Sequence, residues 1–159
     1  MSEAPAGPRE RLAALGLTLP EVPAPVAAYV PAVRTGGFVY TSGQLPFVDG
    51  KLPRTGKVGA EVGVDEARDL ARICALNALA AVVSVAGDLS DIVRIVKVVG
   101  YVASAPGFTA QPQVLNGASE LLGEVFGEAG RHARSAVGVA VLPLDAPVEV
   151  ELIAEVRPA

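Results

Sequence analysis

Two charged residues near the end of the chain, an arginine and a glutamate, are the best suited to do chemistry. Arg134 stays charged at any physiological pH, and its guanidinium can bind a carboxylate or a phosphate through two parallel hydrogen bonds. Glu149 can orient a water molecule, and it can accept that water's proton if burial raises the pKa of its carboxyl group. Each has a structural alternative: Arg134 could pair with Glu155 or with an acid of another subunit, and Glu149 could belong to an interface ion pair.

The segments that carry these two residues alternate apolar and polar side chains with a period of two. Residues 134–141 and 148–156 therefore indicate half-buried strands, and the proline-containing segment between them favours a turn. We predict one β-hairpin in which the last residue of the first arm pairs with the first residue of the second, so that the valines of both arms face the helices. In that register Arg134 and Glu149 share the other face but lie roughly 20 Å apart. They could meet only across a subunit boundary, so we expect this face to be an interface that contains a ligand site.

The rest of the chain predicts an α+β fold. The element order β-β-α-β-α-β-β, with an antiparallel hairpin at each end, predicts a mixed sheet with two helices packed on one face and another subunit against the other. Residues 1–23 are predicted to be an N-terminal extension, a short helix and a proline-rich linker, ahead of a domain formed by residues 24–159. The remaining predicted elements are a helix at 8–16, strands at 27–33, 38–44 and 92–102, and helices at 64–86 and 112–128.

Four other residues are candidates for a site, each with a structural alternative. Gly43 follows a strand and would let a ligand approach the backbone, or it marks a bulge. Asn116 is polar on an apolar helix and needs a hydrogen-bond partner, which could be a ligand or the protein. Cys74 lies on an apolar helix stripe and is predicted to pack in the core. His132, the one histidine, is placed at most at the rim of a pocket.

Composition restricts the class of protein. A chain of 159 residues predicts one domain with a sizeable core, and a net charge of -4 without a basic cluster argues against a nucleic-acid partner. A single cysteine excludes an intrachain disulfide and, with one histidine, disfavours a structural zinc site. We find no secretory signal, and the longest apolar run, residues 75–86, is too short to span a bilayer, so we predict a soluble cytoplasmic protein.

Three stretches together resemble the RidA/YjgF family, also called the endoribonuclease L-PSP family. They are the strand end 40–44 (YTSGQ), the helix with Asn116, and the segment 134–137 (RSAV) followed by 148–151 (VEVE). The resemblance covers residues 24–156. It implies a chorismate-mutase-like fold and a homotrimer with sites in the clefts between subunits. It also implies hydrolysis of enamines and imines, such as 2-aminoacrylate, to 2-keto acids and ammonia, without a metal or organic cofactor.

The resemblance also implies roles for particular positions. Arg134 matches the arginine that binds the substrate carboxylate, and Glu149 matches the glutamate that handles the attacking water. One position departs from the family, because Ala136 stands where many active members have cysteine. The other positions that match site-lining residues are Tyr29, Ser42, Gly43 and Asn116.

Two functions therefore remain open. The first is an enamine or imine deaminase acting on small carboxylates. The second is a trimer that binds small carboxylate metabolites without turnover, which the alanine at position 136 favours. The ribonuclease activity in the family's older name is disfavoured by the acidic charge of the chain and its lack of a basic groove.

Overall fold

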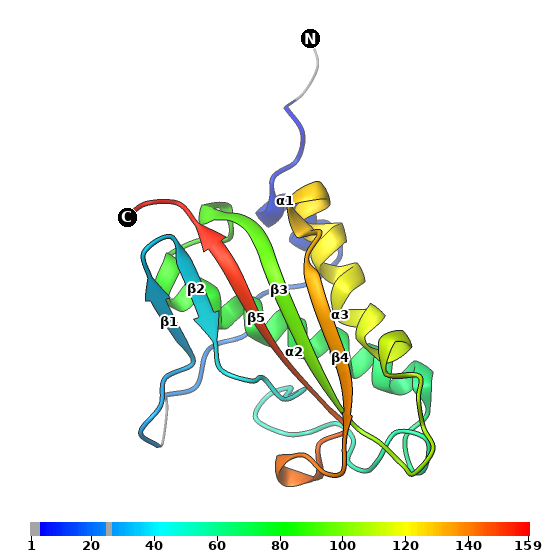
Figure 1. The fold of residues 1–159 in the computed structure, drawn as a ribbon. Helices are drawn as coiled ribbons and strands as arrows, with labels where there is room; N and C mark the ends of the chain where they lie inside the picture. Colours follow the sequence, from blue (N-terminus) through cyan, green and yellow to red (C-terminus); the bar gives the residue numbers. More distant parts are fainter. Residues whose placement is uncertain (1–3, 25–26) are drawn as a thin grey trace.

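The protein has one five-stranded mixed sheet with the strand order β1-β2-β5-β3-β4. This is seen in a computed structural model that describes residues 4–24 and 27–159 (Figure 1). The strands are β1 (Ala32–Thr35), β2 (Phe38–Thr41), β3 (Ile92–Ala103), β4 (Ala133–Val139) and β5 (Val148–Val156). The helices are α1 (Pro8–Ala14), α2 (Val64–Ala86) and α3 (Gln111–Phe126), with short 3-10 turns at Leu89–Asp91, Gly127–Gly130 and Pro143–Asp145.

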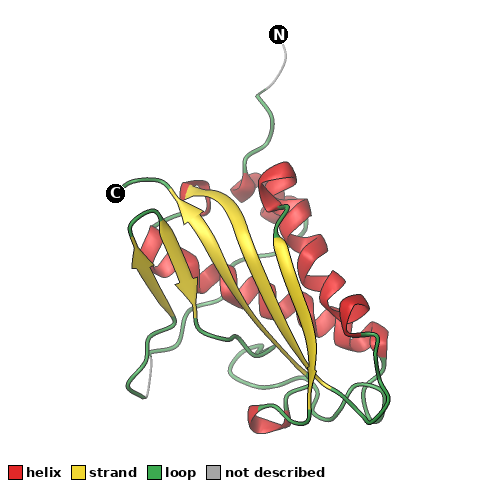
Figure 2. Ribbon diagram, viewed as in Figure 1, coloured by secondary structure: helices red, strands yellow, loops and turns green. Residues whose placement is uncertain are grey.

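Helices α2 and α3 cover one face of the sheet, as predicted, so the α+β fold is confirmed (Figure 2). Helix α2 starts with two acids in its first turn, which suits the positive end of the helix dipole. It ends at Gly87, whose positive φ of 106° favours glycine. The helix is long and apolar enough to cross a membrane by length and composition, but it is a core helix with ten buried side chains.

The two helices are in close contact where they cross. A Cβ added to Gly117 of α3 would overlap the backbone carbonyl oxygen of Arg68 of α2, so the helices could not approach this closely with a larger residue. Beyond this point along both helices, Arg68 pairs with Glu120 and Arg72 pairs with Glu124 at 2.9 Å. Helices α2 and α3 therefore pack together as one layer over the sheet.

The predicted C-terminal hairpin is wrong, because β4 and β5 are not neighbours. Strand β3 lies between them, antiparallel to β5 and parallel to β4. Helix α3 connects β3 to β4, and a crossover of this kind returns the chain beside the strand it left, in the same direction. The eight-residue connection at 140–147 then passes the end of β3 to start β5 on its other side.

This topology also corrects the predicted sheet faces. Arg134 is level with Val98 and, one strand further, with Leu152, and these two side chains are buried under the helices. Glu149 is level with Tyr101 and then Val137 on the opposite, uncovered face. Arg134 and Glu149 therefore lie on opposite faces of one sheet, not on one face as predicted.

The N-terminal hairpin is confirmed, but its strands are shorter than predicted. Strand β1 starts at Ala32, so Tyr29 lies in the preceding loop, with 60% of its surface exposed. Strand β2 ends at Thr41 because Ser42 turns to the loop before β1. Its backbone N–H donates to Pro31 O at 2.8 Å and its hydroxyl donates to Val30 O at 2.6 Å.

The N-terminal segment packs on the fold. Helix α1 contacts α3, and Leu12 belongs to the buried core. Leu17 and Leu19 of the following linker also pack against that core. The division into an extension and a domain at residue 24 stays a prediction.

Candidate functional site

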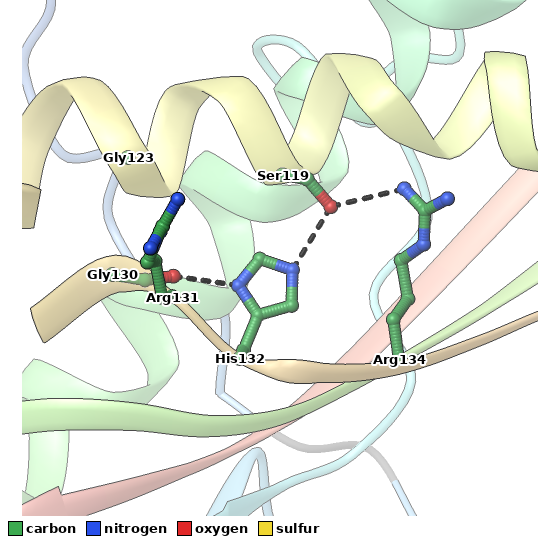
Figure 3. Close-up of a pocket in the computed structure, with 6 residues that line it drawn as sticks. All are labelled: Ser119, Gly123, Gly130, Arg131, His132 and Arg134. Carbon is green, nitrogen blue, oxygen red and sulfur yellow. Dashed lines mark hydrogen bonds between the residues drawn. The ribbon is translucent and has the colours of Figure 1, made fainter. Parts of the chain in front are cut away.

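The predicted Arg134 and Asn116 lie together between β4 and α3. Nη1 of Arg134 donates to Asn116 Oδ1 at 2.9 Å. It also donates to Ser119 Oγ at 3.1 Å (Figure 3). Asn116 and Ser119 are three residues apart on α3, so they share one face of that helix. No hydrogen bond from Nε or Nη2 of Arg134 is found within residues 4–24 and 27–159, so one edge of the guanidinium keeps its donors for a ligand.

His132 joins this group through Ser119. Its Nδ1 lies 2.6 Å from Gly130 O and its Nε2 lies 2.9 Å from Ser119 Oγ (Figure 3). A carbonyl oxygen only accepts hydrogen bonds, so Nδ1 carries the proton and Nε2 accepts the Ser119 hydroxyl. Burial lowers the pKa of His132 and the nearby Arg134 lowers it further, which outweighs the opposite effect of the bond to Gly130. The imidazole is therefore neutral at pH 7.

We call Asn116, Ser119, His132 and Arg134 the α3–β4 cluster. It borders an open hollow of about 480 Å³ whose wall includes two arginines, Arg131 and Arg134. Of these, Arg131 lies 3.8 Å from Glu128 and is largely exposed. The two guanidinium groups of this wall attract an anion. Ala136, two residues beyond Arg134 on the same side of β4, packs against the hydrophobic core.

Glu149 and Gly43 form a second group on the uncovered face, away from the α3–β4 cluster. The Glu149 carboxylate lies over Gly43, where an added Cβ would overlap its Oε1. The pairing of Gln44 with Val150 beyond the end of β2 brings these segments together. Burial raises the pKa of Glu149, and the charge of Glu151 on the same strand raises it further.

Tyr101 separates the roles of the two glutamates. Its hydroxyl donates to Glu151 Oε1 at 2.5 Å, and this bond, together with burial, raises the pKa of Tyr101 to about 12. For Glu149, in contrast, no side-chain hydrogen bond is found in the part of the chain that the structure describes. Its carboxylate is therefore available to a water molecule.

Tyr29 and Ser42 lie near this second group but do not aim at a shared point. The Ser42 hydroxyl is occupied by Val30 O, and this bond fastens the exposed loop that bears Tyr29 beside Gly43. The seven predicted residues thus divide into two sets. Arg134, Asn116 and Ala136 are at the β4 edge. Glu149, Gly43, Ser42 and the Tyr29 loop are at the side of β2 and β5.

Ser119 was not among the predicted site residues, and His132 was predicted only at the rim of a pocket. Two signals could have found them: Ser119 follows Asn116 by three residues on a helix, and His132 precedes Arg134 by two residues in the extended segment that leads into β4. Each spacing puts both residues of a pair on one face. Cys74 is buried in the core, as predicted.

Outside these two groups of residues, the described chain offers fewer reactive side chains. A larger hollow of about 870 Å³ lies between linker residues Pro20–Ala24 and α2, and none of the predicted site residues lines it. Within residues 4–24 and 27–159, no three His, Cys, Asp or Glu side chains are grouped so that they could hold a metal ion.

Replacing Glu149 with glutamine is expected to raise the free energy of unfolding at pH 7. A glutamate whose pKa is higher in the folded state binds its proton more tightly there, so folding loses stability as the pH rises through 4.5 and the folded-state pKa. Glutamine does not titrate, so the variant does not lose this stability as the pH rises. Urea unfolding of wild type and Glu149→Gln at pH 4 and pH 7 measures the difference in the free energy of unfolding. The advantage of the variant should be larger at pH 7, and an advantage independent of pH would contradict the assignment.

Comparison with known proteins agrees with the fold and with the resemblance. The family profile described as "YjgF/chorismate_mutase-like, putative endoribonuclease" matches residues 9–156. The chain therefore belongs to the YjgF/RidA family. Its relatives include Protein TCP17 of Trypanosoma cruzi, 46% identical over 144 residues that cover 90% of each chain.

Two further relatives span the range of similarity within this family. The crystal structure of Atu1372 from Agrobacterium tumefaciens, a protein of unknown function, matches with a TM-score of 0.87 and 48% identity, covering 94% of this chain and 93% of that one. The "Putative reactive intermediate deaminase TdcF" of Escherichia coli is 32% identical over 83% of this chain and 89% of its own. Its structure with bound serine matches with a TM-score of 0.64. The chain is thus more similar to relatives without an assigned activity than to TdcF.

Proposed function

We propose that the protein hydrolyses small enamine and imine acids to 2-keto acids and ammonia, at sites shared between the subunits of a homotrimer. The observation that carries the proposal is the held guanidinium of Arg134. Asn116 and Ser119 fix it through Nη1, and the other edge keeps the paired donors that suit a carboxylate. The name of TdcF, a more distant relative, and the serine bound to TdcF support a small amino-acid-like ligand.

The division of the site residues into two sets supports a site between subunits. Arg134 lies toward the edge of the sheet on the helix side, whereas Glu149 faces away from the helices. A neighbouring subunit that places its Glu149 close to Arg134 of the first subunit would bring the two groups to one substrate. The uncovered face also has large exposed apolar side chains that favour burial against another copy: Val33, Phe38, Tyr40 and Val137.

The chemistry needs a positioned water and two proton transfers. Arg134 holds the substrate carboxylate, and Glu149 of the adjacent subunit orients a water molecule and accepts its proton as the oxygen attacks the imine carbon. Protonation of the amine nitrogen and cleavage of the C–N bond then release ammonia and leave the 2-keto acid. The raised pKa of Glu149 suits a group that takes and returns a proton.

Release of 2-keto acids from enzymatically generated imines of several amino acids tests this proposal. Wild type should accelerate release over the spontaneous rate, and Glu149→Gln should not. The same Glu149→Gln protein should remain folded and be at least as stable as wild type at pH 7. An unchanged rate across the whole panel with folded wild-type protein would refute the deaminase.

Replacing Gly43 with alanine is expected to lower this activity at least tenfold while leaving the fold intact. The new Cβ would occupy the position of the Glu149 carboxylate, which is the movable end of a side chain and can swing aside. A displacement of about 1 Å costs as much as 100-fold in rate. Rates of release and thermal melting of Gly43→Ala measure the two effects.

Gly37→Ala is the matched control, because its nearest neighbour, Val156 O, would lie 3.9 Å from the added Cβ. It should keep wild-type activity. Full activity in Gly43→Ala would show that the carboxylate over Gly43 does not take part.

The second candidate is a trimer that binds small carboxylates without turnover. Ala136 favours this candidate, since many active members of the YjgF/RidA family have cysteine at this position. Calorimetric binding of 2-keto acids, lost in an Arg134 variant and accompanied by no acceleration on any imine, would establish binding alone.

A further inference from the structure

Ser119 helps to hold Arg134, but its second hydrogen bond, to His132, has no part in the proposed deamination. We propose that Ser119 and His132 are a nucleophile and its general base, and that they hydrolyse small esters with a carboxylate on the acyl group in the hollow over β4 (Figure 3). This activity goes beyond the proposed deamination and does not depend on it.

The geometry fits an activated serine. Ser119 Oγ is within hydrogen-bond reach of His132 Nε2, and a third group, Gly130 O, orients the imidazole through Nδ1. Gly130 is itself fixed, because it is buried and an added Cβ would overlap the backbone oxygen of Leu122. The imidazole is therefore held with its accepting nitrogen toward the serine.

Ser119 does not make the usual bond of a helical serine. Such a hydroxyl commonly donates to a carbonyl of the preceding turn, as Ser84 of α2 does to Ala81 O at 2.6 Å. Ser119 instead donates to an imidazole, accepts from Arg134, and lines an open hollow. A helix serine with a base and a cation beside a hollow is arranged for reaction more than for capping.

The charges around His132 keep it neutral and attract an anion. Arg131 and Arg134 line the same hollow, whereas the carboxylates of α3, on Glu120 and Glu124, pair with arginines of α2. Burial lowers the pKa of His132 and the charge of Arg134 lowers it further, while Arg131 lies 3.8 Å from the carboxylate of Glu128. The two arginines that line the hollow favour substrates with a negative charge, and its volume of about 480 Å³ suits a small one.

The reaction balances with water as the second substrate. Ser119 Oγ attacks the ester carbonyl carbon and its proton passes to His132 Nε2. The tetrahedral oxyanion lies near the free edge of the Arg134 guanidinium, and its collapse expels the alcohol, which takes the proton from Nε2. Water then attacks the acyl-serine with His132 again as base, which releases the carboxylic acid and restores the hydroxyl.

Labelling with a fluorophosphonate probe, followed by peptide mass spectrometry, tests the nucleophile directly. Wild type should carry the label on Ser119, and Ser119→Ala should carry none. Ser84→Ala is the matched control and should be labelled as wild type is, since Ser84 is a helix serine without a base. Absence of label on wild type, or equal labelling of Ser119→Ala, would overturn the proposal.

His132→Gln separates reaction from packing. Glutamine retains hydrogen-bonding groups but cannot take a proton, so the labelling rate should fall roughly 100-fold while the melting temperature changes little. The wild-type rate should be constant near pH 7 and fall only below about pH 6.5, as His132 becomes charged. An unchanged rate in His132→Gln would assign the pair to a structural role.

Ester hydrolysis tests the substrate class. Mono-p-nitrophenyl succinate and glutarate should be hydrolysed at least tenfold faster than p-nitrophenyl acetate, and Ser119→Ala should lose this activity. Equal rates on the neutral and the charged esters would overturn the anionic substrate class. Neither result depends on whether the protein releases 2-keto acids from imines, so the two functions fail separately.

Discussion

Replacing Arg134 with alanine is expected to lower imine hydrolysis at least 100-fold in a protein that still folds. The guanidinium is the one group of the α3–β4 cluster that can bind a carboxylate through two parallel hydrogen bonds. Loss of such a charge-assisted pair costs about 3 kcal/mol, which corresponds to roughly 150-fold in rate at 1.36 kcal/mol per factor of ten. The fold should survive because Arg134 is only half-buried and Asn116 and Ser119 can bond to water in its place.

Two further variants make this result specific. Arg134→Lys keeps the charge but loses the planar fork, so it should recover only a small part of the activity. Arg9→Ala removes the same charge from α1, where Arg9 pairs with Asp88 at the surface, and should keep wild-type activity. Release of 2-keto acid by all four proteins, with circular dichroism to confirm folding, is the measurement. An Arg134→Ala protein with more than half of the wild-type rate would remove this arginine from the reaction.

The covering helices could be predicted from the sequence because their signals are local. Helix α2 was predicted at 64–86 and is observed at Val64–Ala86, since acids at its start and Gly87 at its end set both boundaries. Helix α3 was predicted at 112–128 and ends at Phe126, because Gly127 adopts a positive φ of 61° and begins a 3-10 turn.

The arrangement of the last two strands could not be read in the same way. Alternation with a period of two shows which side chains share a face of a strand, but it does not show which strand lies next to it. The predicted connection at 142–147 is short enough for a hairpin. It is also long enough to join two strands that have a third strand between them. Here the crossover through α3 places β4 beside β3, and the predicted Val141–Val148 pairing fails.

The candidate site was predictable as a set of residues but not as an arrangement. The family resemblance marked both Arg134 and Asn116 as site residues, and in the structure Nη1 of Arg134 lies 2.9 Å from Asn116 Oδ1. The contact of Glu149 with Gly43 depends on the pairing of Gln44 with Val150 beyond the end of β2, which has no local sequence signal. Spacing could have indicated Ser119 and His132 one at a time, but not their contact, because they meet only where α3 lies along β4.

Gly117→Ala is expected to be among the most destabilising substitutions in the chain, at about 2–3 kcal/mol. Glycine normally lowers helix stability by about 1 kcal/mol relative to alanine, so a buried glycine inside α3 needs a packing reason. The reason is the crossing with α2, where the added Cβ would overlap the carbonyl oxygen of Arg68, a backbone atom that cannot move without its helix. The two helices would have to separate, which opens the core and weakens the ion pairs of Arg68 and Arg72.

Gly123→Ala on the same helix is expected to stabilise the protein instead. No heavy atom lies within 4 Å of its added Cβ, so the substitution only improves helix propensity and should stabilise the protein by about 0.5–1 kcal/mol. Thermal unfolding of both variants tests the pair: at about 2–4 °C per kcal/mol, Gly117→Ala should melt roughly 5–10 °C below wild type and Gly123→Ala slightly above it. Because both changes add the same methyl group to α3, similar shifts of the two melting temperatures would contradict a close crossing of α2 and α3 at Gly117.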